Sequence, residues 1–388
     1  MPRGLRCLLV ALALFPLAAA AQVVPYRGEP ARLDTVRLDP SAVADLVSAE
    51  DLRALFPGRV RIRAVGDVML GTDYPSADYL PPEDRNVLAP VAALLADADL
   101  TFANLEGPIL DGGTSTKCPE PSPVCYAFRT PARYGGYLAE AGIDLASLAN
   151  NHAQDFGEEG RQRTIALLDS LGIAWSGPVG TAASVRKNGL RIAMAAFHTA
   201  DHSNYVNDEA AAAAFVERLD AEHDLVLVSF HGGAEGRGAT RVPEGREFFL
   251  GEDRGDLRAF ARAVIDAGAD LVVGHGPHVP RGIEMYRGRL IAYSLGNFAT
   301  YGRFSLRGVS GLAPVLEVVL DGDGTFLGGR VLSARQVGEG EPRPDPTGEA
   351  ARVMRRLTAL DFPDSDAVLD ADGTIRVRDA AAAARGEQ

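Results

Sequence analysis

The chain has 388 residues, of which 46% are hydrophobic and 23% are charged. This composition excludes a largely disordered, collagen-like or multi-span membrane protein. The chain carries 39 basic and 52 acidic residues, which gives a formal net charge of -13. A protein this acidic is poorly suited to nucleic acid, because binding to DNA or RNA depends on neutralising phosphates. We therefore expect no nucleic-acid partner.

Residues 1–21 have the order of features found in a secretory signal peptide. Arg3 and Arg6 give a basic start, residues 7–17 are almost wholly apolar, and a run of alanines ends at Ala21. The apolar run is shorter than the roughly 20 residues that a membrane-spanning helix needs. We predict export to the periplasm or the cell exterior, with cleavage near Ala21.

Composition divides the rest of the chain into three segments. Residues 22–58 read as a polar N-terminal extension with one helix over 40–55, and residues 59–335 as the main domain. Residues 336–388 are predicted to hold a linker over 336–346, a helix over 349–360 and a tail from Asp379 onward. The linker prediction depends on the density of glycine, glutamate and proline there.

Two cysteines remain after removal of the signal peptide, and they flank a proline-rich loop. Pro119, Pro121 and Pro123 lie between Cys118 and Cys125, so this segment is neither helix nor central strand. In an oxidising compartment, two isolated cysteines in one loop are expected to pair. We predict a Cys118–Cys125 disulfide with a structural role.

The main domain alternates between strand and helix patterns. Short apolar runs predict buried strands at residues 61–65, 100–103, 145–148, 191–197, 225–230 and 271–273. Helical patterns separate them at residues 87–98, 131–141, 157–171, 208–221 and 255–267. After Gly274 the pattern changes to strands joined by short turns, at residues 283–286, 290–293, 313–320 and 325–332. The alternation predicts an α/β layered fold.

Metal-binding residue types follow five of the predicted strands directly. These residues are Asp67, Asn104 and Glu106, the run Asn150-Asn151-His152, His231, and the pair His275 and His278. A single aspartate or asparagine after a strand is usually a turn or helix cap, and a lone histidine is more often a satisfied or surface residue than a ligand. In open α/β sheets, however, ligands bind beyond the carboxyl ends of the strands, so these loops are expected to converge. Carboxylate, amide and imidazole together favour zinc, manganese or iron.

These residues lie in six motifs that occur in order along the chain and together resemble one family. The motifs are Gly66-Asp67-Val68-Met69-Leu70-Gly71, Asn104-Leu105-Glu106, Ala149-Asn150-Asn151-His152, His231-Gly232-Gly233-Ala234-Glu235, Gly274-His275-Gly276-Pro277-His278 and Tyr293-Ser294-Leu295-Gly296-Asn297-Phe298. The set resembles the CapA family of capsule-synthesis proteins, also called poly-γ-glutamate synthesis proteins, within the calcineurin-like metallophosphoesterase superfamily. The resemblance covers residues 61–335 and implies a four-layer αββα sandwich with a metal centre at the strand ends.

The resemblance also implies roles for single residues. Asp67 and His278 would bind one divalent cation, and Glu106 would bridge to a second. Asn151, His231 and His275 would complete the second site. His152 would protonate a leaving group or stabilise a transition state. One or two ions of manganese, zinc or iron are implied, and two such cations could clamp a phosphoryl or acyl oxygen.

The sequence departs from the family pattern at two places. Typical metallophosphoesterases have Asp-x-His where this chain has Asp67-Val68-Met69, and a methionine does not replace an imidazole as ligand for a borderline ion. The first metal site is therefore expected to have one ligand fewer. The usual His-Trp-Gly reads His231-Gly232-Gly233, which removes an aromatic wall from the cleft.

Four further residues are weaker candidates for substrate contact: Glu235, Arg241, His198 and Asn297. His198 and the nearby His202 also fit a polar surface loop, Arg241 fits a solvated loop, and Asn297 fits a turn. His223, at the end of a helical pattern, is most simply a partner of the helix dipole.

Three functions remain open from the sequence. The leading hypothesis is an exported metal-dependent hydrolase of capsule or poly-γ-glutamate biosynthesis, acting on an anionic polymer, phosphoester or peptide. The second is a non-catalytic capsule-assembly component that works with membrane proteins of capsule synthesis. The third is a metal-dependent peptide epimerase. His152 beside a nearly full ligand set favours catalysis.

Overall fold

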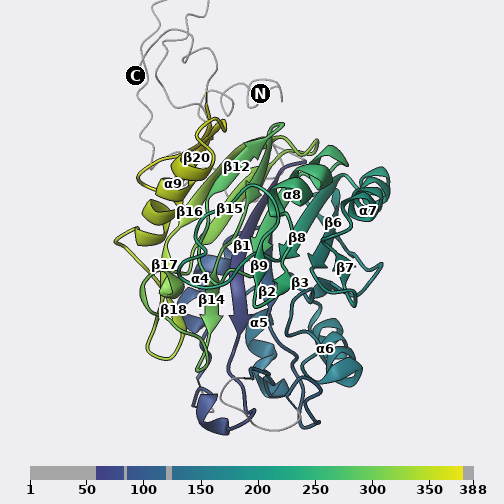
Figure 1. The fold of residues 1–388 in the computed structure, drawn as a ribbon, viewed down its shortest axis with the longest axis vertical. Coiled ribbons are helices and arrows are strands. Elements are labelled where there is room, and N and C mark those ends of the chain that lie inside the picture. Colours follow the sequence, from purple (N-terminus) through teal and green to yellow (C-terminus); the bar gives the residue numbers. More distant parts are fainter. Residues whose placement is uncertain (1–57, 83–84, 119–124, 379–388) are drawn as a thin grey trace, which may run out of the picture. The chain divides into compact units, whose positions relative to one another are not determined.

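Two β-sheets lie at the centre of the structure, a computed structural model that describes residues 58–82, 85–118 and 125–378 (Figure 1). The predicted signal peptide, its cleavage site and the helix over 40–55 lie outside the described residues. The tail from Asp379 onward also lies outside them. Within the described part of the chain, no helix is long and apolar enough to cross a membrane.

The larger sheet has the strand order β19-β20-β16-β15-β1-β2-β3-β4, with β14 also paired to β1. Strand β1 is parallel to β2 and β14 and antiparallel to β15. The strand bounds are β1 Val60–Met69, β2 Leu100–Leu105, β3 Leu145–Ser147, β4 Ala174–Ser176, β14 Asn297–Thr300, β15 Val315–Leu320, β16 Phe326–Leu332, β19 Ala367–Leu369 and β20 Thr374–Val377.

The smaller sheet has the order β12-β13-β11-β8-β6-β5, with β7 paired to β6. Its central strand β8 is parallel to both β6 and β11. The bounds are β5 Ala183–Lys187, β6 Leu190–His198, β7 Asn204–Tyr205, β8 Leu225–His231, β11 Leu271–His275, β12 Ile283–Tyr286 and β13 Arg289–Ala292. Two further hairpins pair β9 (Phe248–Phe249) with β10 (Glu252–Asp253), and β17 (Ala334–Val337) with β18 (Glu341–Pro344).

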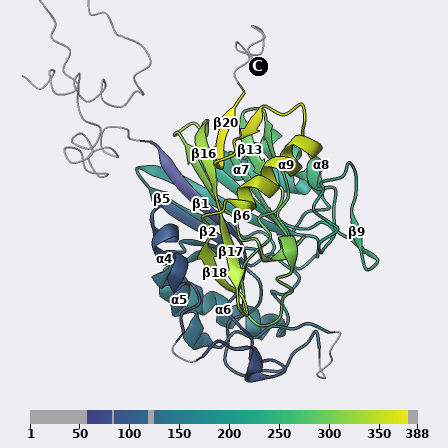
Figure 2. The ribbon, with the colours of Figure 1, turned by 90° about the vertical axis from the view of Figure 1, so that its left-hand side faces the viewer.

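Helices cover the outer faces of both sheets, as Figure 2 shows with α4 and α5 on one side and α8 on the other. The helix bounds are α4 Ala89–Ala96, α5 Gly136–Glu140, α6 Gly157–Leu171, α7 Glu209–Glu222, α8 Leu257–Asp266 and α9 Glu349–Asp361. One apolar core, which includes Phe102 and Leu227, joins the two sheets. A second core, with Leu95 and Leu168, lies under the helices of the larger sheet, and a third, with Val216 and Phe260, under those of the smaller. The layers therefore run α/β/β/α, which confirms the predicted fold class.

Helix α8 shows how the sequence produces one of these layers. Its buried residues Leu257, Phe260, Ala261 and Val264 recur at the spacing of one helical face. The Asp256 side chain caps the helix by accepting the N–H of Ala259 at 3.0 Å. Apolar periodicity and capping thus fix both the start of the helix and the face it buries.

The C-terminal segment differs from its prediction. Residues 336–346 were expected as a linker, but they carry most of the β17–β18 hairpin. Gln336 is buried there and accepts hydrogen bonds from both the N–H and the hydroxyl of Thr300, while Glu341 pairs with Arg85 and Arg343. Polar residues with such distant partners look like a linker in the sequence, because the partners are not visible in the local pattern. The predicted helix is confirmed as α9, and β19 and β20 extend the larger sheet.

The close approach of Gly66 to residue 296 generates a prediction about stability. A Cβ atom on Gly66 would lie 1.9 Å from the Gly296 carbonyl oxygen. We expect Gly66→Ala to lower the free energy of unfolding by at least about 2 kcal/mol, because the strands must separate. Urea unfolding measures this change. Gly136→Ala is the control, since no atom lies within 4 Å of its Cβ position. Equal stability of the two variants would contradict the packing described.

Candidate functional site

Two rows of polar residues meet at the carboxyl ends of parallel strands. In the larger sheet, Asp67 is in register with Asn104 on β2 and Asn297 on β14. In the smaller sheet, His231 is in register with His275 on β11 and with His198 on β6. The rows touch where Asn104 Nδ2 lies 3.3 Å from His231 Nδ1 and His275 Nδ1 lies 3.4 Å from Asp67 Oδ1. The strand ends therefore converge as the sequence predicted.

Asp67 is the centre of this arrangement and has no solvent-exposed surface. Its Oδ1 accepts a hydrogen bond from Asn104 Nδ2 at 2.9 Å, and its Oδ2 lies 2.9 Å from His278 Nδ1. Burial alone would raise the pKa of Asp67, but the adjacent rings of His275 and His278 hold it well below its usual range. The carboxylate is therefore ionised in the interior of the protein.

Glu106 is equally buried but has no hydrogen-bond partner at either carboxylate oxygen among the described residues. Burial, and then the negative charge of Asp67, raise the pKa of Glu106 well above its usual range. The nearest positive charge is His278, whose Nε2 lies 3.6 Å from Oε1. Two carboxyl groups thus lie side by side in a region that is short of positive charge.

His278 joins the two carboxyl groups. Its φ of 58° is in the left-handed region, which residues other than glycine rarely adopt. Nδ1 contacts Asp67 and, at 3.1 Å, Asn297 Oδ1, while Nε2 lies 3.8 Å from Glu235. Burial disfavours the charged form of the His278 ring and lowers its pKa. The carboxylates of Glu106, Asp67 and Glu235 together have the larger, opposite effect and raise the pKa of His278 to about 10.

The residues present fit a divalent metal ion. Ligand atoms of Asp67, Glu106 and His278 all lie within 4.8 Å of one another. Further buried atoms without a hydrogen bond among the described residues are Asn151 Oδ1, His231 Nε2 and both ring nitrogens of His275. Each buried polar atom left unpaired costs about 1–3 kcal/mol, which a cation bound among them would offset. Met69 is no ligand here, because its sulfur accepts the N–H of Gly71 at 3.2 Å.

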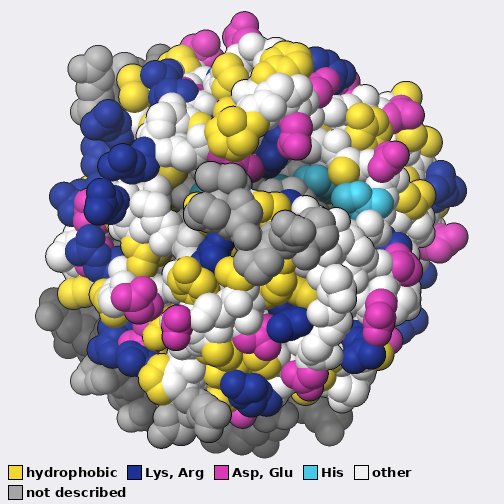
Figure 3. Space-filling view, turned by 60° about the horizontal axis from the view of Figure 1, so that its bottom comes forward, with side chains coloured by type: hydrophobic (Ala, Val, Ile, Leu, Met, Phe, Trp, Pro, Cys, Tyr) yellow, Lys and Arg dark blue, Asp and Glu magenta, His cyan; other side chains and the backbone are white. Residues whose placement is uncertain are grey.

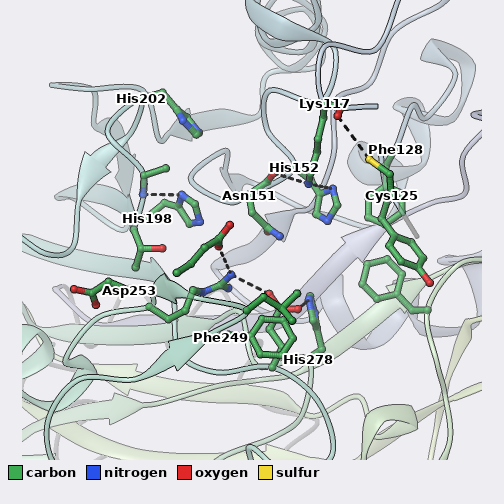
Figure 4. A pocket seen from close by; sticks show the side chains of 18 of the residues that line it. Lys117, Cys125, Phe128, Asn151, His152, His198, His202, Phe249, Asp253 and His278 are labelled. Atoms are coloured by element: carbon green, nitrogen blue, oxygen red, sulfur yellow. Dashed lines mark hydrogen bonds and ion pairs between the residues drawn. The ribbon is translucent and has the colours of Figure 1, made fainter. Parts of the chain in front are cut away.

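A pocket of about 860 Å³ opens above this cluster. Histidine side chains are visible in a hollow on this face of the molecule (Figure 3). Figure 4 shows Asn151, His152, His198 and His278 arranged around the pocket. Other lining residues are Lys117, Cys125, Phe128, His202, Glu235, Phe249, Arg254, Arg303 and Phe304. Of the cluster, Asn151 and His278 line this pocket.

His152 lies in the pocket wall with its ring held on two sides. Nδ1 lies 2.7 Å from Asp155 Oδ2, and the ring stacks on Phe128 with 4.1 Å between centroids. Asp155 is fully buried and also accepts the Phe128 N–H at 2.7 Å. Burial lowers the pKa of His152, although Asp155 opposes this effect. A neutral ring that donates from Nδ1 to Asp155 leaves Nε2 for proton exchange with a bound molecule.

Asn104 and Asn150, which the sequence placed among the metal-binding residue types, hold these parts together by hydrogen bonds. Asn150 Nδ2 donates to Asn104 Oδ1 at 3.1 Å and to the Leu105 carbonyl at 2.9 Å. Asn150 Oδ1 accepts the backbone N–H of His152 at 3.1 Å. The network therefore links Asp67, through Asn104, to the loop that carries Asn151 and His152. Both asparagines lie within the strand-end motifs, and this position was the signal in the sequence that could have identified their role.

Three of the four weaker candidates lie in or beside the site. Glu235 pairs with Arg254 at 3.0 Å, His198 lines the pocket, and Asn297 contacts His278. Burial, followed by the charge of Arg254, lowers the pKa of His198 well below its usual range. The ring of His198 is therefore neutral.

Arg241 does not join the site, which corrects its assignment as a substrate contact. Its side chain pairs with Asp361 at the end of α9 and donates to the Leu360 carbonyl at 3.2 Å. Arg241 is close to Glu235 in the sequence, but its side chain pairs with Asp361, so closeness in sequence did not predict its position. His223 lies where expected, with Nδ1 2.9 Å from the Leu219 carbonyl at the end of α7.

The structure joins Cys118 to Cys125 by a disulfide, as predicted. Cys125 lines the pocket, and the neighbouring Lys117 donates from Nζ to the Asn151 carbonyl at 3.0 Å. Lys117 Nζ also lies 3.3 Å from Asp155 Oδ1. The disulfide therefore joins Cys125 to the residue that follows Lys117.

Comparison with known sequences gives one consistent family. The family model described as "Bacterial capsule synthesis protein PGA_cap" matches residues 61–301. The chain is 27% identical to the capsule biosynthesis protein CapA of Bacillus anthracis, over 77% of this chain and 73% of that protein. It is 28% identical to the PGA biosynthesis protein CapA of Bacillus subtilis, over 60% of this chain and 61% of that protein.

Two solved structures show a distant likeness. A calcineurin-like phosphoesterase, YfkN, from Bacillus subtilis matches 78% of this chain and 98% of its own, with a TM-score of 0.44 and 9% identity. A 5'-nucleotidase precursor from Thermus thermophilus matches 78% of this chain and 58% of its own, with a TM-score of 0.40 and 13% identity.

The charge around His278 leads to a prediction for the metal-free protein. Because its pKa is raised to about 10, the His278 ring should stay protonated through pH 8 and lose its proton only near pH 10. Glu106→Gln removes the carboxylate whose charge contributes most to raising the pKa of His278, so this substitution should lower that pKa. Imidazole chemical shifts followed by NMR against pH measure both values. A His278 titration near pH 6.5 in the metal-free wild type would contradict the geometry.

Proposed function

Since the chain belongs to the bacterial capsule synthesis protein PGA_cap family, we propose that it is an exported, metal-dependent hydrolase of capsule or poly-γ-glutamate biosynthesis. Export is proposed from the pattern of residues 1–21. One observation supports the hydrolase assignment. Glu106, His231 and His275 have buried metal-ligating atoms without a hydrogen-bond partner among the described residues, and they lie beside the ionised Asp67.

The proposed ligands are those that the family resemblance implied. Asp67, Glu106 and His278 would hold one cation, and Asn151, His231 and His275 would hold a second with Glu106 between them. The donor types suit manganese, zinc or iron. A bound divalent cation supplies Lewis acidity toward a phosphoryl or carbonyl oxygen.

The pocket wall favours an anionic substrate, although the chain as a whole is acidic. Lys117 and Arg303 both line the pocket. The guanidinium of Arg303 lies 4.7 Å from the ring centre of Tyr79 and 4.8 Å from that of Tyr126, and it makes no ion pair within the described residues. Arg303 therefore supplies a positive charge that attracts a phosphate or carboxylate group locally, whereas Lys117 is paired with Asp155.

His152 is the proposed proton carrier. Asp155 accepts the Nδ1 proton, so the ring presents Nε2 to a bound substrate. A proton taken up at Nε2 is stabilised by the Asp155 carboxylate and then passes to the leaving oxygen or nitrogen. Stacking on Phe128 keeps the ring in this orientation.

A non-catalytic role in capsule assembly is the alternative, and the name of one relative favours it. The chain is 28% identical to a probable polyglutamine synthesis accessory protein of Mycobacterium tuberculosis, over 62% of this chain. An accessory protein could use the same metal fold to bind polymer without cleaving it. Such a protein would need no proton carrier beside the metal site.

Replacement of His152 separates the two functions. We expect His152→Ala to keep its fold and metal content but to lose on the order of 10²–10⁴ in turnover, the usual contribution of a general acid or base. The assay compares hydrolysis of a phosphodiester, a phosphomonoester and poly-γ-glutamate after loading with manganese, zinc or iron. His223→Ala is the matched control, because His223 lies at the end of α7 outside the pocket. No turnover by the metal-loaded wild type on any of the three would favour the assembly role.

A further inference from the structure

Arg254 is a buried arginine with unused donors in the pocket wall. Only 2% of its surface is exposed, and it follows directly after β10. Nη1 lies 3.0 Å from Glu235 Oε1 and 3.6 Å from Glu252 Oε2. Nε and Nη2 have no hydrogen-bond partner among the described residues. Nε and Nη2 together form the planar fork that binds two oxygens of one carboxylate or phosphate.

The backbone around Arg254 is fixed by the glycines that follow His231. The N–H of Gly233 donates to the Arg254 carbonyl at 2.8 Å. A Cβ atom on Gly232 would lie 2.9 Å from the same carbonyl oxygen. The glycine at 232 therefore leaves room for the backbone carbonyl of Arg254.

His198 supplies a third donor in the same wall. Its Nδ1 accepts the backbone N–H of Ala200 at 3.1 Å. A backbone N–H only donates, so the neutral ring carries its hydrogen on Nε2. This Nε2 is buried, lacks a partner among the described residues, and belongs to a side chain that lines the pocket. An N–H at this position binds an acceptor and does not ligate a metal.

We propose that Arg254 and His198 form an oxyanion subsite beside the metal cluster, which binds a carboxylate or phosphate group of the substrate away from the bond that is cleaved. The proposal rests on the proposed function, since it names the chemical group that a substrate of this pocket must carry. Glu235, Glu252 and Asp253 also line the pocket. Glu235 and Glu252 face Nη1 of Arg254, and Asp253 pairs with Arg246 at 2.7 Å, so these three carboxylates leave Nε and Nη2 without a partner.

Binding of two small probes tests the subsite. The metal-loaded protein is titrated by calorimetry with γ-glutamylglutamate, which carries carboxylates, and separately with inorganic phosphate. Arg254→Lys keeps the charge that pairs with Glu235 but removes the fork, so it should weaken binding about tenfold or more. Arg246→Lys, on the same hairpin, makes the same chemical change outside the pocket and should bind like wild type.

Two substitutions of His198 give a second, independent test. Asn at this position retains an acceptor for the Ala200 N–H but lacks the outer donor, so His198→Asn should bind about tenfold more weakly. His198→Gln places an amide donor near the position of Nε2 and should restore most of the affinity. These variants decide the proposal if Arg254→Lys does not fold.

The two probes identify the oxyanion, and controls separate this proposal from the proposed function. Weakening for the dipeptide alone assigns a carboxylate, weakening for phosphate alone assigns a phosphate, and weakening for both assigns a general oxyanion site. Wild-type affinity of Arg254→Lys and His198→Asn for both probes, with metal content unchanged, would overturn the subsite. Metal content and turnover are measured on the same samples, so a failure of the hydrolase assignment is seen separately.

Discussion

The site depends on one constraint: two carboxyl groups are buried where the surrounding residues supply too little positive charge to compensate both. Asp67 and Glu106 lie at adjacent strand ends with no exposed surface, and His278 is the imidazole that contacts both. Transfer of an ionised carboxylate into a protein interior is strongly unfavourable unless a cation or hydrogen bonds compensate it. The fold holds this unfavourable arrangement in place through the register of β1 with β2 and β14. A bound divalent cation would relieve it.

The register also explains why the site needs both sheets. Asp67, Asn104 and Asn297 come from the larger sheet, while His231 and His275 come from the smaller. The apolar core between the sheets sets their separation, and the polar rows meet only beyond it. Packing in the middle layers therefore positions the functional groups, and the close approach at Gly66 is part of the same requirement.

Strand-end motifs made much of the fold and of the ligand cluster predictable from the sequence. Asp67, His231 and His275 each follow an apolar run that is long enough to identify a buried strand, so their convergence followed from topology. Arg254 and Arg241 could not be predicted in this way. Both lie in charged, glycine-containing segments. Only tertiary contacts distinguish them, because Arg254 pairs with Glu235 in the pocket wall and Arg241 pairs with Asp361. The β17–β18 hairpin was missed for the same reason, because its buried polar residues depend on partners far away in the sequence.

The most direct measurement of the central proposal is the position of a bound metal ion. Crystals of the full chain grown with manganese would be measured at the manganese absorption edge, and an anomalous difference map would be calculated. We expect a peak in contact with Asp67, Glu106 and His278. A map from saturated crystals with no peak at these three side chains, or with peaks only at exposed acidic residues, would contradict it.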